Sequence, residues 1–363
     1  MIPIARPLID QEEINAVVDV MRSGVIAQGS RVLDFENAFG KFIGVNHAIA
    51  VNSGTSALQV ALQAAGIQNG DEVVTSSFSF IATANSILYT GAKPVFSDIS
   101  LDTFNIDPDD VQNRITSRTK AIIPVHLYGH PAEMKAIMDI AQDNDLVVIE
   151  DACQAHGAMY HGRYAGSFGI GTFSFYPTKN MTTSEGGMIT SSSPEFDELA
   201  RMIRSHGSRQ RYVHEILGYN FRMTDISAAI GLVQLEKLDG FTEMRINNAD
   251  HLSSGLKGLE GIEVPQVIEG CKHVFHQYTI RVTQDCKLTR DELMNILDEK
   301  GIGTGIYYPV PIHKQPFYKK LGYNDTLRDT EKASKQVISL PVHPSVSVDE
   351  LDHIINTIGE VIG

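Results

Sequence analysis

The residues best suited to chemistry lie where short apolar segments of the sequence end. The stretch NSGTSAL, residues 52–58, leads from an apolar run into a helical pattern through Gly54, Thr55 and Ser56. Free N–H groups, two hydroxyls and the positive end of a helix dipole at such a turn would suit a phosphate group. The same turn could be a simple Ser or Thr helix cap, and taken alone that interpretation is favoured.

Asp151 and Lys179 supply two charged groups in similar places. Asp151 lies just after the apolar run LVVI at 146–149, and a carboxylate there could keep a ring nitrogen protonated, although it could equally cap a helix. Lys179 lies in the polar turn YPTKNMTTSEGG between two apolar runs. A lysine that forms a Schiff base must be partly desolvated, so that its amine can be neutral, whereas most lysines in loops are simply solvated.

The combination is more specific than its parts. A phosphate-binding turn, a carboxylate and a lysine between strands, all in one domain, are what pyridoxal 5'-phosphate (PLP) requires. The turn would anchor the phosphate, the carboxylate would pair with the pyridinium, and the lysine would hold the aldehyde.

The elements that must position these residues alternate between strand-like and helical patterns. Seven apolar runs have the length of strands, at residues 47–52, 71–76, 93–99, 121–127, 146–152, 172–176 and 186–191. Helical segments such as TSALQVALQAAG separate the earlier runs. This alternation predicts an α/β fold with a mostly parallel central sheet and helices on both faces, in which ligands bind beyond the carboxyl ends of the strands.

Capping boxes predict helices at both ends of the chain. They pair Asp10 with Glu13, Thr289 with Glu292, and Ser347 with Glu350. The first helix would carry the apolar stripe Ile14, Val17, Val18 and Met21 and would stop at Gly24. The other two helices lie beyond the strand-like run at 276–282, so we expect a large domain at residues 1–240 and a smaller C-terminal α+β domain at residues 241–363.

Composition excludes several classes of function. The 363-residue chain has a formal net charge of −14, which argues against a nucleic-acid-binding surface. Its three cysteines have no CxxC spacing and are interpreted as reduced thiols. The sequence shows neither a signal peptide nor an apolar window of membrane-span length. We therefore expect a cytoplasmic protein that binds neither nucleic acid nor membrane.

Two other enzyme classes fail on spacing. The motif HLYGH at 126–130 contains a glycine and follows a strand, and no HExxH occurs, so no metal site is expected. The glycine-rich stretch GSFGIG at 166–171 lacks the GxGxxG spacing, and GIGTGI at 301–306 is not in a βαβ unit, which disfavours a nicotinamide dehydrogenase.

Four separated blocks of sequence resemble a known family. NSGTSAL, EDACQAHGA, FSFYPTKNMTTSEGGM and LGYNFRMTDISAAIGLVQLEKL closely resemble the DegT/StrS-like sugar aminotransferases, a branch of the fold-type I PLP enzymes. The resemblance runs from ARPLID near the start to ISLPVHPSVS near the C-terminus. It implies a large PLP-binding domain and a smaller C-terminal domain.

The resemblance also implies roles for individual residues. Lys179 would form the Schiff base, Asp151 would pair with the pyridine nitrogen, and Gln154 would contact the ring 3-hydroxyl. The phosphate ligands would be the backbone near Gly54 and the side chains of Thr55, Ser56 and Ser174. Phe80 would stack on the cofactor, with Phe78 as its rival. Asn220 would reach the phosphate of the neighbouring subunit, which implies a homodimer with shared active sites.

The reaction implied by the resemblance is transfer of an amino group, most often from L-glutamate, to a nucleotide-linked keto sugar, with 2-oxoglutarate as co-product. KNMTTSEGGM resembles the branch that aminates C4 of 4-keto-6-deoxyhexoses, whereas the C3 branch more often shows KNLGA-like sequence. The candidate substrate residues are His206, Arg222, Tyr307, Tyr308 and His313. The nucleotide, the sugar, the product stereochemistry, the amino-sugar or polysaccharide pathway and any assembly beyond a dimer are left open.

Three alternatives remain beside this interpretation: amination at C3, a PLP-dependent sugar dehydratase or deoxygenase, and a PLP-binding regulatory protein. Some dehydrating relatives replace the lysine with histidine, so Lys179 favours transamination. The chain departs from the family pattern at Ser184, where relatives usually have glycine. If that position needs a positive φ, serine is strained there.

Overall fold

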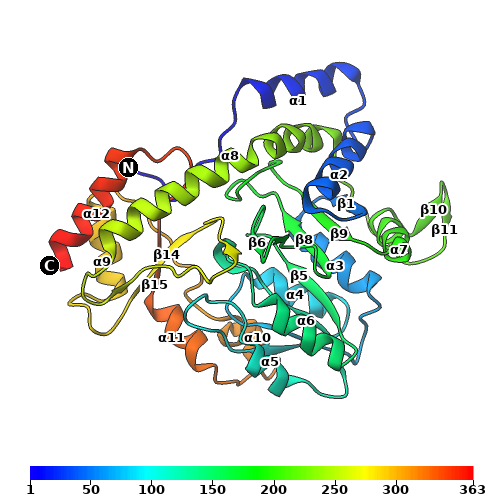
Figure 1. The fold of residues 1–363 in the computed structure, drawn as a ribbon. Coiled ribbons are helices and arrows are strands. Elements are labelled where there is room, and N and C mark those ends of the chain that lie inside the picture. Colours follow the sequence, from blue (N-terminus) through cyan, green and yellow to red (C-terminus); the bar gives the residue numbers. More distant parts are fainter. Residues whose placement is uncertain (363) are drawn as a thin grey trace.

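The computed structural model describes residues 1–362 and is built on a seven-stranded sheet (Figure 1). The strands lie in the order β1-β9-β8-β5-β4-β2-β3. Their bounds are β1 His47–Val51, β2 Glu72–Ser76, β3 Lys93–Ser97, β4 Thr119–Ile123, β5 Val147–Asp151, β8 Ile170–Ser174 and β9 Gly187–Ser191. From β8 to β3 all neighbours are parallel, and β9 runs antiparallel to both β8 and β1. The expected mostly parallel sheet is confirmed.

Helices cover both faces of this sheet because successive strand residues point to opposite sides. In β1, Ile49 and Val51 pack with residues of α3 and α7, whereas Ala48 and Ala50 pack with residues of α2 and α8. The helices that form apolar clusters with the sheet are α2 Ser30–Ile43, α3 Gly54–Ala64, α4 Ile81–Tyr89, α5 Pro108–Arg114, α6 Met134–Asp143, α7 Pro194–Arg204 and α8 Asp225–Leu256. The α/β fold is therefore confirmed.

The capping box at Asp10 begins the predicted N-terminal helix. Helix α1 (Gln11–Ser23) has both hydrogen bonds of the box and ends at Gly24, whose φ is 75°. Its apolar stripe faces outward: Ile14 and Met21 are 48% and 54% exposed, while the helix buries Glu13. In the Figure 1 view α1 lies at the top of the molecule, beyond α8.

Helix α2 is capped by a residue distant in sequence. Its own N-cap, Gly29, has no side chain to accept a hydrogen bond. The carboxylate of Asp225, at the start of α8, accepts from the N–H groups of Gly29 (2.7 Å), Arg31 (3.3 Å) and Val32 (3.0 Å) instead. This contact joins the beginnings of two helices that pack side by side over the sheet.

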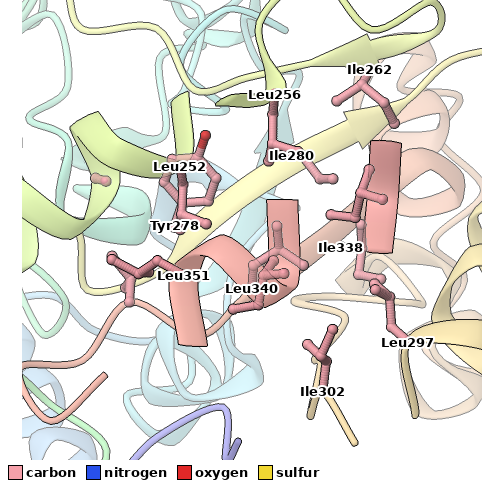
Figure 2. Close-up of a cluster of buried hydrophobic side chains, with 14 of the residues drawn as sticks. Leu252, Leu256, Ile262, Tyr278, Ile280, Leu297, Ile302, Ile338, Leu340 and Leu351 are labelled. Atoms are coloured by element: carbon pink, nitrogen blue, oxygen red, sulfur yellow. The ribbon is translucent and has the colours of Figure 1, made fainter. Parts of the chain in front are cut away.

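A second apolar core lies at the other end of α8 (Figure 2). A three-stranded antiparallel sheet, β12 Ile262–Glu263, β14 Tyr278–Val282 and β15 Val337–Leu340, packs there with α9 Arg290–Glu299 and α12 Val348–Ile362. The predicted capping boxes at Thr289 and Ser347 are both present. Leu252 and Leu256 of α8 belong to the same core, so the expected boundary at 240/241 falls inside this helix, and the exact division into domains stays a prediction.

The remaining β-strands and α-helices are short. They are β6 Met159–Tyr160, β7 Arg163–Tyr164, β13 Cys271–Lys272, α10 Pro316–Lys320, α11 Arg328–Gln336, and a hairpin of β10 Ser208–Gln210 and β11 Val213–His214. The hairpin projects from the body of the molecule next to α7 (Figure 1). Within residues 1–362, no helix combines the length and apolar character needed to cross a bilayer.

Candidate active site

A cavity of about 500 Å³ opens where the carboxyl ends of β2, β5 and β8 meet. Its walls come from the start of α3, the segment around Phe80, the segment after β5, the turn at Lys179, and Tyr307 and Tyr308 from the C-terminal part of the chain. The site therefore lies at the sheet edge where the sequence placed it.

The turn at the start of α3 both caps the helix and faces the cavity. The Ser53 hydroxyl accepts a hydrogen bond from the N–H of Ser56 (3.1 Å), and the Ser56 hydroxyl donates to Asn52 Oδ1 (2.7 Å). Ser53, Gly54 and Thr55 line the cavity, whereas Ser56 is buried in the cap and does not. The N–H of Ser56 is used by this cap, whereas the N–H groups of Gly54 and Thr55, at the cavity wall, have no acceptor within the helix.

Gly54 allows this turn to lie against β8. A Cβ atom at Gly54 would lie 2.6 Å from Ser174 Cβ and 3.1 Å from Cys153 Sγ, too close for any other residue. Ser174, the last residue of β8, lines the cavity beside it. The close approach brings a helix N-terminus and two hydroxyl side chains to one wall of the cavity.

Asp151 is a buried carboxylate at the end of β5. Its Oδ2 accepts a hydrogen bond from the Thr83 hydroxyl (2.7 Å), which in turn lies 2.8 Å from the Ser79 hydroxyl. Its Oδ1 accepts from the N–H of Cys153 (3.2 Å). In the described part of the chain no Lys, Arg or His side chain forms an ion pair with Asp151. A buried carboxylate of this kind is stabilised by a cation that enters the cavity.

Lys179 lies in the turn after β8, with its backbone N–H bonded to the carbonyl of Tyr176 (2.9 Å). Burial lowers the pKa of Lys179 below its usual 10.5, and the negative charge of Asp151 partly opposes this. Its Nζ makes no hydrogen bond or ion pair with residues 1–362. The amine therefore faces the cavity with a raised fraction of its neutral, nucleophilic form.

Gln154 and two tyrosines form another wall. Gln154 Oε1 accepts from the backbone N–H of Tyr128 (2.9 Å), which leaves Gln154 Nε2 to donate to the Tyr308 hydroxyl (3.3 Å). The Tyr128 hydroxyl donates to the carbonyl of Tyr307. Burial raises the pKa of Tyr308, so its phenol stays neutral and can donate a hydrogen bond.

The structure distinguishes between Phe80 and Phe78 as the ring expected to stack on the cofactor. Phe78 is fully buried, with its ring 6.2 Å from that of Phe104. Phe80 lines the cavity, is 55% exposed, and has its ring 6.2 Å from that of Tyr308. Of these two phenylalanines, Phe80 is the one placed to contact a bound ring.

Besides Ser56, four predicted site residues do not line the cavity of this chain. His206, Asn220 and Arg222 are exposed on the segment after α7, where Arg222 Nε donates to Asn220 Oδ1 (3.0 Å). His313 is buried, with Nδ1 2.6 Å from the Ser77 hydroxyl.

The sequence did not identify several residues that line the cavity. Thr83, Cys153, Glu185 and His276 line the cavity. Thr83 follows the carboxyl end of β2, so the rule that ligands bind beyond strand ends could have indicated it. Burial lowers the pKa of His276 well below its usual range, so its ring is neutral.

Ser184 has the backbone conformation that would strain it. Its φ is 71°, in the left-handed region that favours glycine. Serine is therefore strained at this position, where relatives usually have glycine.

Comparison with known proteins decides the family. The model of the DegT/DnrJ/EryC1/StrS aminotransferase family matches residues 7–359. The chain belongs to this family. The family relation, the fold-type I architecture, the PLP cofactor and the aminotransferase activity expected from the sequence are thereby confirmed.

Curated relatives of this DegT-family chain carry different names. It is 45% identical to a pleiotropic regulatory protein of Geobacillus stearothermophilus, over 96% of this chain and 94% of the relative. It is 40% identical to GDP-perosamine synthase of Caulobacter vibrioides (99% and 98%). It is 39% identical to dTDP-3-amino-3,4,6-trideoxy-alpha-D-glucose transaminase of Streptomyces venezuelae (95% and 90%).

Solved structures of the family share the whole fold. S. venezuelae DesV, in complex with a ketimine intermediate, matches with a TM-score of 0.92 and 39% identity, over 96% of this chain and 94% of DesV. NtdA of Bacillus subtilis, with bound cofactor PMP, matches with a TM-score of 0.90 and 34% identity, over 98% and 83%.

Proposed function

We propose that this DegT-family aminotransferase moves an amino group from L-glutamate to C4 of a nucleotide-linked 4-keto-6-deoxyhexose, with Lys179 and Asp151 as its catalytic residues. One observation carries the assignment of these residues: a lysine with a lowered pKa and a buried carboxylate that forms no ion pair within residues 1–362 face the same cavity.

The residues present fit PLP. Among residues 1–362 no side chain forms an ion pair with Asp151, and a protonated pyridine would supply that partner; within the same residues Lys179 Nζ has no hydrogen bond and can bind an aldehyde. The wall at Gly54 has no room for a Cβ atom and offers helix N–H groups with the hydroxyls of Thr55 and Ser174 for a phosphate. Phe80 offers the face of an exposed ring, and Gln154 an amide for the 3-hydroxyl.

When bound, PLP supplies an aldehyde that condenses with amines and a ring that withdraws electrons from the neighbouring carbon. Asp151 holds a proton on the ring nitrogen, because a nearby negative charge favours the cationic form. The Thr83 hydroxyl and the Cys153 N–H keep this carboxylate oriented through their hydrogen bonds. The Thr83 hydroxyl holds Oδ2 of Asp151, and the Cys153 N–H holds Oδ1.

Lys179 moves the proton of the reaction. Burial raises the neutral fraction of its amine, and the free amine removes the proton from the α-carbon of the amino donor. The neutral Tyr308 phenol and Gln154 border the same space and help to exclude water from it. Tyr307 and Tyr308 are the substrate candidates that the cavity itself supports.

A homodimer would complete the site. Asn220 and Arg222 lie outside the cavity of their own chain, so they could serve only the cavity of a second copy. Exposed apolar side chains on α1 and on the hairpin, among them Met21 and Tyr212, offer surface for such contact. The cytoplasmic location expected from composition stays a prediction.

The assignment of C4 as the acceptor carbon depends on the sequence of the segment KNMTTSEGGM. One relative is named as a GDP-perosamine synthase and another as a 3-amino sugar transaminase, at 40% and 39% identity. Overall identity therefore does not separate C4 from C3, and the C4 assignment depends on this segment alone. The name of the Geobacillus relative favours a second candidate, in which the protein also has a regulatory role.

The test is the absorbance spectrum of the PLP-loaded protein before and after addition of L-glutamate. We expect a band near roughly 410–430 nm that L-glutamate converts to a shorter wavelength. Lys179→Ala should show no conversion, whereas Lys135→Ala, at an exposed lysine of α6, should behave as wild type. A band that no amino donor discharges would contradict the proposal.

A further inference from the structure

The cavity contains one carboxylate that the proposed reaction does not use. Glu185 lines the same cavity as Lys179, and its side chain is exposed to it. Across residues 1–362 its carboxylate forms neither a hydrogen bond nor an ion pair.

The turn that carries Glu185 is built to a fixed shape. Ser184 holds its positive φ because its N–H donates to the Thr182 hydroxyl (3.0 Å), which donates to the carbonyl of Phe175 (2.8 Å). The Thr183 hydroxyl donates to the carbonyl of Glu185 itself (2.8 Å). Backbone strain held by several hydrogen bonds is characteristic of functional sites.

The charges of the cavity restrict what Glu185 can bind. The charged side chains among the lining residues are Asp151, Lys179 and Glu185, and the first two are assigned to the cofactor. A carboxylate only accepts hydrogen bonds, so it suits the hydroxyls of a sugar. It repels phosphates and carboxylates that approach the same wall.

We propose that Glu185 is a specificity-determining residue whose carboxylate accepts hydrogen bonds from hydroxyls of the acceptor sugar. This inference rests on the proposed function, because it assumes a nucleotide-linked sugar in the cavity. By its charge, Glu185 also directs the diphosphate of that substrate away from the Lys179 turn.

The test measures how much the sugar adds to binding. Isothermal titration calorimetry on PLP-loaded protein compares UDP, GDP and dTDP with UDP-glucose, GDP-mannose and dTDP-glucose, which lack the keto group and do not react. For each nucleotide, the Kd of the free nucleotide divided by the Kd of its nucleotide sugar gives the contribution of the sugar to binding. Glu185→Ala should reduce this ratio by about ten-fold or more, the value of a hydrogen bond to a charged group, and Glu185→Gln by about three-fold.

Binding of the free nucleotide should stay within about two-fold of wild type, or become tighter, because a negative charge is removed. Glu260→Gln, at an exposed glutamate outside the cavity, is the matched control and should leave both values unchanged. Suppose that wild type binds the nucleotide sugar more tightly than the free nucleotide, and both Glu185 variants keep this difference in affinity. The role proposed for Glu185 is then wrong, and the proposed function stands. If wild type gains nothing from any sugar, the proposed function fails, and this inference fails with it.

Discussion

Replacing His156 with phenylalanine should change how the stability of the cofactor-free protein depends on pH. His156 is fully buried, with its ring 5.5 Å from that of Phe173 and 5.6 Å from that of Phe175. Neither ring nitrogen has a hydrogen-bond partner in the described chain. Burial lowers the pKa of His156 from 6.5 to about 3, so the ring is neutral in the folded protein.

The size of the effect follows from this pKa difference. Between pH 6.5 and 3 the unfolded chain binds a proton at this histidine that the folded protein does not. Stability is therefore fully present above the unfolded pKa and is lost as pH falls toward the folded pKa. Going from pH 7 to pH 5, His156 alone should reduce the free energy of unfolding by about 2 kcal/mol.

His156→Phe removes this proton-binding difference. The larger ring adds a pH-independent packing cost of about 1–3 kcal/mol, so the comparison uses the change between pH 7 and 5 and not the absolute stability. In urea unfolding, the free energy of unfolding of His156→Phe should fall between pH 7 and pH 5 by about 2 kcal/mol less than that of wild type. His353→Phe, at an exposed histidine of α12, should keep the wild-type loss. An equal loss in His156→Phe and wild type would refute a buried, neutral His156.

Three further predictions concern single residues. Ser184→Gly should raise the free energy of unfolding by about 0.5–1 kcal/mol, because the strain relieved at φ 71° exceeds the added entropy of glycine; a lower melting temperature would contradict this. Lys179→Met should stabilise the cofactor-free protein near neutral pH, because the folded pKa of this lysine is lowered; its advantage should shrink as pH rises toward 10.5, and a constant difference in a pH series would show that burial does not matter. Asp225→Ala leaves three N–H groups at the start of α2 without their acceptor and should cost about 2–3 kcal/mol in urea unfolding, whereas an unchanged midpoint would exclude that cap.

The features that the sequence predicted well depend on near neighbours. A capping box needs only residues three positions apart, so the boxes at Asp10 and Thr289 could be located from their residue types. The apolar runs gave the strands because burial on both faces of a parallel sheet requires continuous apolar residues. Asp151 and Lys179 could be selected as candidates because each lies just after such a run, and both line the cavity, whereas their roles stay predictions.

The features that the sequence did not predict depend on distant contacts. Thr83 bonds to Asp151 across 68 positions, and nothing near Thr83 indicates this partner. Thr55 and Ser56 are both hydroxyl residues at one helix start, and only the direction of the helix decides which faces the cavity. The stripe of α1 shows a similar limit, because periodicity identifies an apolar face but not what covers it.

Lys179 is the residue that we propose holds PLP. Borohydride reduction of the PLP-loaded protein fixes the cofactor to its lysine, and peptide mass spectrometry then locates it. We expect the added phosphopyridoxyl mass on the peptide that contains Lys179, and its loss in Lys179→Ala. The same mass on another lysine, or on none, would show that Lys179 does not hold PLP.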